Sequence, residues 1–162
     1  MSIRLFITGG TFDKEYNELE EKLLFKDTHM GDILKQARSK LDIKIRTLMM
    51  IDSLHMTAED RENIAQNCQK STEDKIVITH GTGTMEDTAK YLSDRIKDKT
   101  IVLTGAMIPF VLGNSDGLFN LGTALAFVQT LPHGVYIAMN GKFFHAGKVH
   151  KNTSIGVFEE TT

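Results

Sequence analysis

The sequence predicts an α/β fold with a doubly wound, mostly parallel sheet between two helical layers, the flavodoxin/Rossmann-like three-layer arrangement. Five short apolar runs rich in β-branched residues alternate with four stretches of helical periodicity. Three of these runs are apolar nearly throughout, as in strands that helices cover on both faces. Right-handed crossovers then give one doubly wound domain. Residues 1–162 suit a single domain and are too few for two ordinary ones.

The predicted strands are the apolar runs, which are bounded by Gly, Asp or Lys. In chain order they are IRLFIT from Ile3, IKIRTLMM from Ile43, KIVITH from Lys75, TIVLTG from Thr100 and GVYIAM from Gly134. After Met139 the pattern is less regular, and NGKFFHAGKVHKN predicts a short extra strand or hairpin and a loop.

Helix start signals precede the stretches between the strands. Thr57 followed by Asp60 resembles a capping box. Thr84 followed by Asp87 has the same spacing and predicts a second one. The remaining candidates are GDILKQARSK, capped by Asp27 or Thr28, and GLFNLGTALAFVQT, capped by Ser115 or Asp116.

Charge and composition bound the partners. The formal net charge is -2 without a basic stripe or acidic tail, which predicts neither a nucleic-acid nor a membrane partner. The apolar stretch at the N-terminus is too short for a signal-peptide core, and no run approaches the roughly 18 residues of a membrane span. The single cysteine, Cys68, is expected to be a packing residue, and its lack of a disulfide partner favours a reducing, cytoplasmic location.

Two threonines beside glycines follow the first and third predicted strands. In an open α/β sheet, ligands bind at the carboxyl ends of the strands where the strand order switches, and a flavodoxin-like order places Thr11 opposite Thr82 there. Glycine lets main-chain N–H groups approach a ligand, where they can stabilise an oxyanion. A threonine hydroxyl is a weak nucleophile that needs a base or a charged neighbour. The pair therefore indicates acyl transfer.

Other interpretations compete with this one. Taken singly, GGT and HGTGT fit tight strand-to-helix turns, and His80 is expected to hydrogen-bond within its turn rather than act as a base. The chain lacks both G-x-x-x-x-G-K-[ST] and G-x-G-x-x-G after a strand, which disfavours nucleotide binding. The histidines lack metal-ligand spacing, and His145 and His150 in one loop are not expected to bind a metal.

Several segments together carry a specific signal that covers essentially the whole chain. They are TGGTF at Thr8, DSLHMT at Asp52, HGTGTMEDTA at His80, LTGAM at Leu103, SDGLFNL at Ser115 and MNGKFFHAGKVHKN at Met139. In order and spacing the chain resembles the N-terminal domain of the bacterial-type L-asparaginase family. The resemblance implies an asparaginase N-terminal-like domain over residues 1–162, with the family's C-terminal domain absent.

The resemblance implies a catalytic set. Thr11 matches the family's nucleophile, and Tyr16 matches the mobile-loop tyrosine that activates or positions it. Thr82 matches the second catalytic threonine. Lys151 falls where the family lysine pairs with that threonine, and Lys148 is the alternative if the loop is shifted.

The resemblance also implies a set of substrate-binding residues. Ser53 matches the serine that holds the substrate's α-carboxylate, and the Ala106 carbonyl matches the group that meets the leaving amide nitrogen. Gly10, Gly81 and Gly83 complete the substrate-binding positions.

The chain departs from the family at three positions in these segments. Gly83 stands where the family has an aspartate that contacts the substrate's α-amino group, and Leu54 and His55 stand where it has polar or acidic residues. Losing one charge-assisted hydrogen bond costs about 1.5–3 kcal/mol, which is roughly ten- to a hundred-fold in affinity or rate. The carboxylates near enough in sequence to replace that aspartate are Asp13, Glu15 and Glu86; otherwise a substrate without a free α-amino group, or a weak activity, is expected.

The implied function is an amidohydrolase that converts L-asparagine, or a close small amide, to aspartate and ammonia through a threonine acyl-enzyme. No metal or organic cofactor is expected, and a homo-oligomer is expected to replace the contacts of the missing domain. The alternative is a non-catalytic amino-acid-binding or regulatory protein that keeps the fold, which Gly83 favours and the two retained threonines disfavour. Hydrolysis of another small amide or ester is a third possibility.

Overall fold

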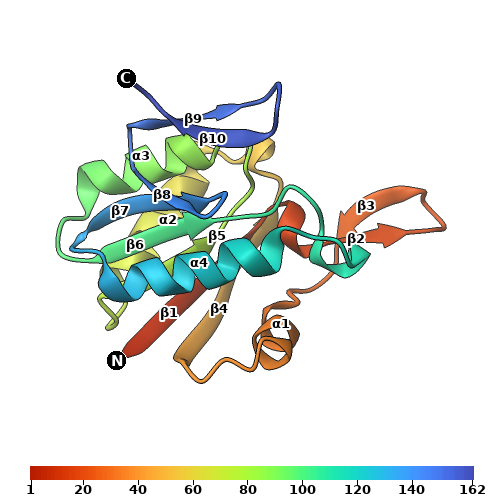
Figure 1. Cartoon of the computed structure of the whole chain (residues 1–162), viewed down its shortest axis with the longest axis horizontal. Coiled ribbons are helices and arrows are strands. Elements are labelled where there is room, and N and C mark those ends of the chain that lie inside the picture. Colours follow the sequence, from red (N-terminus) through yellow and green to blue (C-terminus); the bar gives the residue numbers. More distant parts are fainter.

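The computed structural model describes residues 1–162 and is built on a six-stranded sheet (Figure 1). Five strands are parallel, and the sixth pairs antiparallel at one edge. In spatial order they are β4 (Asp42–Ile51), β1 (Ser2–Gly9), β5 (Lys75–Thr79), β6 (Thr100–Thr104), β7 (Gly134–Met139) and β8 (Lys142–His145). The first predicted strand lies between the second and third, so the flavodoxin-like order is confirmed.

Successive residues of a strand point to opposite faces of the sheet. Both faces are therefore apolar here, and helices cover both of them. On one side lie α2 (Ala58–Lys70) and α3 (Met85–Arg95), whose core cluster takes Phe6, Ile76 and Ile78 from the strands. On the other side lie α1 (Met30–Gln36) and α4 (Gly117–Thr130), whose cluster takes Leu5, Ile7 and Val77. Cys68 of α2 is buried, and burial raises its pKa to about 12, which confirms a packing role. None of the helices combines the length and apolar character needed to cross a membrane.

Two hairpins lie outside the sheet. The predicted strand or hairpin after Met139 is β8 followed by the hairpin of β9 (Val149–Asn152) and β10 (Val157–Glu160), which packs on the α3 side (Figure 1). The hairpin of β2 (Lys14–Asn17) and β3 (Lys22–Phe25) projects from the body of the molecule and was not predicted. Its segment KEYNELEEKLLF is charged and lacks the strict alternation that marks a half-buried strand.

One predicted helix cap is confirmed in detail. The Thr57 hydroxyl accepts from the main-chain N–H of Asp60 at 3.2 Å, and the Asp60 carboxylate accepts from the N–H of Thr57 at 2.8 Å. The short aspartate therefore closes the box as a glutamate would.

Two other caps differ from the prediction. Thr84 precedes α3, but its hydroxyl donates to the carbonyl of Ser53 at 2.8 Å, so no capping box forms. The N-cap of α1 is His29 rather than Asp27 or Thr28, and the N–H of His29 donates to the distant Asp13 carboxylate at 2.8 Å. At α3 a tertiary contact replaces the local cap, whereas at α1 the Thr28 hydroxyl still accepts from the N–H of Met30 at 3.2 Å.

At α4 the N-cap is Asp116, one of the two predicted residues, but its carboxylate does not cap the helix. It accepts from the main-chain N–H groups of Met107 and Ile108, each at 3.0 Å, and so fixes the loop after β6. The neighbouring Ser115 hydroxyl accepts from the N–H of Gly117 at 2.9 Å.

Replacing Thr57 by alanine is expected to lower the free energy of unfolding by about 1 kcal/mol, because one N-terminal N–H of α2 loses its acceptor. Urea unfolding followed by circular dichroism measures the change. Thr153→Ala is the matched control, since Thr153 lies exposed in a turn and its hydroxyl makes no hydrogen bond. An equal loss in both variants would contradict the capping role.

Candidate active site

Close backbone approaches bring three loops together at the carboxyl ends of the parallel strands. Gly10 follows β1 with a φ of 81°, and a Cβ placed on it would lie 2.4 Å from the main-chain nitrogen of Gly81. A Cβ on Gly81 would lie 2.6 Å from Oγ of Ser53. Any side chain at either glycine would push the loops apart. The loops that carry Thr11, Ser53 and Thr82 are therefore packed backbone to backbone.

An amine reaches the hydroxyl of Thr82, a residue that is 7% exposed. Nζ of Lys151 donates to Oγ1 of Thr82 at 2.8 Å, although 69 positions separate them in the sequence. The Glu86 carboxylate of α3 accepts from the main-chain N–H of Lys151 and ties β9 in place. The structure thus brings Lys151, and not Lys148, to the threonine.

Ser53 is buried and forms the start of the short 3₁₀ helix η2 (Ser53–His55). Its Oγ accepts from the main-chain N–H of Thr84 at 3.1 Å, which binds the loop after β4 to the start of α3. The hydroxyl proton of Ser53 has no protein acceptor and is free to donate to a ligand.

Thr11 opens the 3₁₀ helix η1 (Thr11–Asp13) and is partly buried. Tyr16 lies on β2 of the projecting hairpin and is 54% exposed. Neither hydroxyl makes a hydrogen bond, to the other or to any protein group. The structure therefore places Thr11 beside the Gly10–Gly81 contact but does not join Tyr16 to it, and the role of Tyr16 stays a prediction.

Free main-chain groups accompany the two threonines. The N–H groups of Gly81, Thr82 and Gly83 donate to no protein acceptor, and the carbonyl of Ala106 accepts from no protein donor. The Ala106 loop lies close by, since a Cβ on Gly105 would lie 3.4 Å from the methyl carbon of Thr82. A row of unpaired N–H groups at a strand end offers a binding place for negative charge.

The three carboxylates considered as replacements for the family aspartate each lie beside another group. Asp13 is fully buried and accepts from the N–H of His29, and burial raises its pKa although these hydrogen bonds oppose the rise. One Glu15 oxygen lies 3.2 Å from Nε2 of the His29 ring, without a hydrogen bond between them. Glu86 accepts from the N–H of Lys151. The atoms nearest to a Cβ placed on Gly83 belong to Leu54 and Ser53, not to any of these carboxylates.

His80 is a structural residue, as expected. Its Nδ1 faces the carbonyl of Gly81 at 2.7 Å and its Nε2 faces the hydroxyl of Thr88 at 2.8 Å. A carbonyl can only accept, so the ring proton belongs on Nδ1 and Nε2 accepts from Thr88. Burial lowers the pKa of His80 to about 4, so the ring stays neutral and holds the turn before Thr82.

Two residues that support the site were not predicted. Arg61 of α2 donates to the hydroxyls of Thr84 and Thr88, both at 3.0 Å, and so ties α2 to the start of α3. Lys14 forms an ion pair with Asp52 at 2.9 Å, which joins the base of the β2–β3 hairpin to the loop that carries Ser53. The sequence gives one signal for the contact of Lys14 with Asp52. The two residues have opposite charges and lie in or beside the segments TGGTF and DSLHMT.

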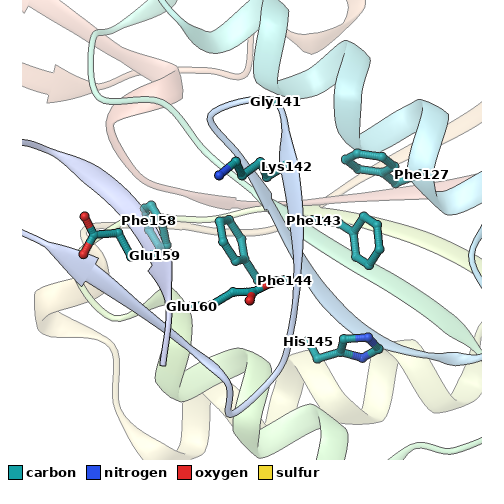
Figure 2. A pocket seen from close by; sticks show the side chains of 9 residues that line it. All are labelled: Phe127, Gly141, Lys142, Phe143, Phe144, His145, Phe158, Glu159 and Glu160. Atoms are coloured by element: carbon teal, nitrogen blue, oxygen red, sulfur yellow. The ribbon is translucent and has the colours of Figure 1, made fainter. Parts of the chain in front are cut away.

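A cavity of about 750 Å³ lies away from the two threonines (Figure 2). It is lined by residues of α4, β8 and β10, and Figure 2 shows the Phe127 and Phe143 rings beside each other. Their centroids are 5.2 Å apart in an edge-to-face arrangement. None of the predicted site residues lines this cavity.

The His80 ring is expected to remain neutral, with its proton on Nδ1, at pH 5.5. Because folding lowers its pKa from 6.5 to about 4, the free energy of unfolding falls as the pH drops through that interval. The loss is about 3 kcal/mol once the pH is below the folded pKa. Long-range ¹H–¹⁵N correlation spectra report the ring state directly, and a doubly protonated His80 ring at pH 5.5 would rule this out.

The chain matches a known protein family over nearly its whole length. Residues 2–158 match the family model described as Asparaginase, N-terminal. The chain is 33% identical over 165 residues to an L-asparaginase of Thermococcus kodakarensis, covering 97% of this chain and 49% of that protein. It is 33% identical over 166 residues to a probable periplasmic L-asparaginase of Haemophilus influenzae, covering 96% and 48%.

Solved structures give the same result. The thermostable L-asparaginase of Thermococcus kodakarensis superposes with a TM-score of 0.87 at 32% identity, over 99% of this chain and 51% of that one. A probable cytoplasmic L-asparaginase of Campylobacter jejuni superposes with a TM-score of 0.84 at 33% identity, over 98% and 52%. The chain spans about half the length of these relatives. It belongs to the asparaginase family and corresponds to the N-terminal domain of that family.

Proposed function

We propose that this chain is an amidohydrolase that hydrolyses the side-chain amide of L-asparagine, or of a close small amide, to the acid and ammonia. The observation that carries the proposal is the 2.8 Å hydrogen bond from Nζ of Lys151 to Oγ1 of Thr82, beside the Gly10–Gly81 contact that positions Thr11. A binding protein does not need a lysine amine hydrogen-bonded to one threonine beside a second threonine whose hydroxyl is free.

The reaction has two acyl-transfer steps. In the first, the Thr11 oxygen forms a bond to the amide carbon, and the C–N bond breaks as the nitrogen takes the hydroxyl proton and leaves as ammonia. In the second, water attacks the ester, releases the carboxylic acid and restores the threonine. The free N–H groups of residues 81–83 are suited to the oxyanion, and the Ala106 carbonyl is suited to the leaving nitrogen.

Thr82 and Lys151 are assigned to proton movement. An amine that shares a hydrogen bond with a hydroxyl can stabilise the charge that develops when the proton moves. Ser53 is assigned to the substrate carboxylate, because its hydroxyl proton is unused by the protein. Tyr16 is assigned to Thr11, which requires the β2–β3 hairpin to move when substrate binds.

A non-catalytic amino-acid-binding or regulatory protein is the second candidate. Two observations favour it: the Thr11 hydroxyl has no base in hydrogen-bond reach, and Gly83 supplies no charge. In that case ligands would raise the melting temperature without being hydrolysed.

Ammonia release should fall by about 10²–10⁴-fold in Thr11→Ala, Thr82→Val and Lys151→Met, because each removes a group from proton transfer or attack. A coupled ammonia assay with L-asparagine, L-glutamine and a small panel of amides measures it. Lys148→Met is the matched control, since Lys148 is exposed and does not contact Thr82. Unchanged release in all three variants would refute the assignment, and ligand-induced stabilisation without any release would favour the binding protein.

We also propose a homo-oligomer. The 14-residue helix α4 carries no charged residue, and its Phe119 is 63% exposed beside Gly141 at the rim of the large cavity. An uncharged helix with an exposed aromatic ring is suited to a protein interface. Light scattering after size exclusion at micromolar concentration should give at least a dimer, and Phe119→Glu should shift it toward monomer. A wild-type chain that is only monomeric would contradict this.

A further inference from the structure

The wall of the site beside Ser53 is apolar. Leu54 follows Ser53 on η2, and a Cβ placed on Gly83 would lie 2.8 Å from Cδ2 of Leu54 and 3.2 Å from Oγ of Ser53. The leucine therefore occupies the space next to Gly83, on the side where the Ser53 hydroxyl is free. The Leu54 side chain is 71% exposed, so it can cover a ligand that enters here.

The acidic side chains near this wall already accept hydrogen bonds from protein groups. Asp52 bonds to Lys14 at 2.9 Å and accepts from the N–H of Leu54 at 3.0 Å. The Lys14 hydrogen bond holds the pKa of Asp52 below its ordinary value, so this carboxylate is ionised and already neutralised. Glu86 holds the N–H of Lys151 through one carboxylate oxygen, and the atoms nearest to a Cβ placed on Gly83 belong to Leu54 and Ser53, not to a carboxylate.

The groups that remain free favour an anion. Apart from the Ala106 carbonyl, which is assigned to the leaving nitrogen, the free groups are hydrogen-bond donors. They are the hydroxyl proton of Ser53, the N–H groups of residues 81–83 and the protons of the Lys151 amine that do not bind Thr82. A carboxylate gains charge-assisted hydrogen bonds from such donors. An ammonium group gains none and must leave water beside the Leu54 side chain, which is unfavourable.

We infer that the site selects monoamides of short dicarboxylic acids that lack a free α-ammonium group, with Leu54 and Gly83 as the specificity-determining residues. This rests on the proposed amidohydrolase function. Succinamic acid, which is asparagine without its amino group, is the simplest such substrate. The Thr11 oxygen forms the ester with its amide carbon, ammonia leaves with the hydroxyl proton, and water then gives succinate and the free threonine.

The first experiment compares kcat/KM for ammonia release from succinamic acid and from L-asparagine with the natural chain. The expected ratio favours succinamic acid by about ten- to a hundred-fold, because the ammonium group of asparagine loses water in the site without gaining a charged partner. A ratio at or below one overturns the inference and leaves the proposed function standing. Absence of ammonia from both substrates overturns the two together.

The second experiment restores the charge. Leu54→Ala with Gly83→Asp makes room for a carboxylate and should move the preference toward L-asparagine by about ten- to a hundred-fold relative to the natural chain. Leu54→Ala with Gly83→Asn is the matched control, because it has the same size without the charge and should leave the preference with succinamic acid. An equal shift in both double variants would show that space, and not charge, sets the selection and would overturn the inference. The natural chain's ratio decides the question if either double variant does not fold.

Discussion

The contact of Gly10 with Gly81 is the constraint on which the site depends. Each glycine follows a different parallel strand, and the contact holds only if neither has a side chain, since a Cβ on Gly10 would lie 2.4 Å from the nitrogen of Gly81. The strand order makes the contact possible by placing β1 next to β5. The strand order and the two glycines together place Thr11 and Thr82 on adjacent loops.

Titratable side chains surround this contact and complete the site. His80 is neutral, and both of its ring nitrogens form hydrogen bonds that hold the turn before Thr82. The nearby carboxylates of Asp52 and Glu86 bind Lys14 and the N–H of Lys151. The hydroxyl proton of Ser53 and the N–H groups of residues 81–83 are left for a ligand. These donors are the basis of the inferred preference for substrates that lack an α-ammonium group.

Much of the fold could be predicted because it follows from periodicity. The five apolar runs became the five parallel strands, and the Thr57 box formed as its spacing indicated. The prediction at Thr84 was wrong because the Ser53 carbonyl, 31 positions away, takes its hydroxyl proton. The β2–β3 hairpin was not predicted because a charged, projecting hairpin buries no face and leaves no alternation in the sequence. The partner of Lys151 came from a family resemblance, since no local pattern reports a contact over 69 positions.

The position of Lys151 has a dynamic consequence. Both threonines stand at the ends of strands in the main sheet, whereas the amine stands on β9, in a separate two-stranded ribbon. That ribbon is anchored to the core mainly by Val149 and Phe158 and by the bond to Glu86. Subglobal opening of such a peripheral unit requires less free energy than unfolding of the whole domain. Warming or mild denaturant would therefore detach the amine from Thr82 while the parallel sheet stays intact, so that the Lys151–Thr82 hydrogen bond is lost before the secondary structure.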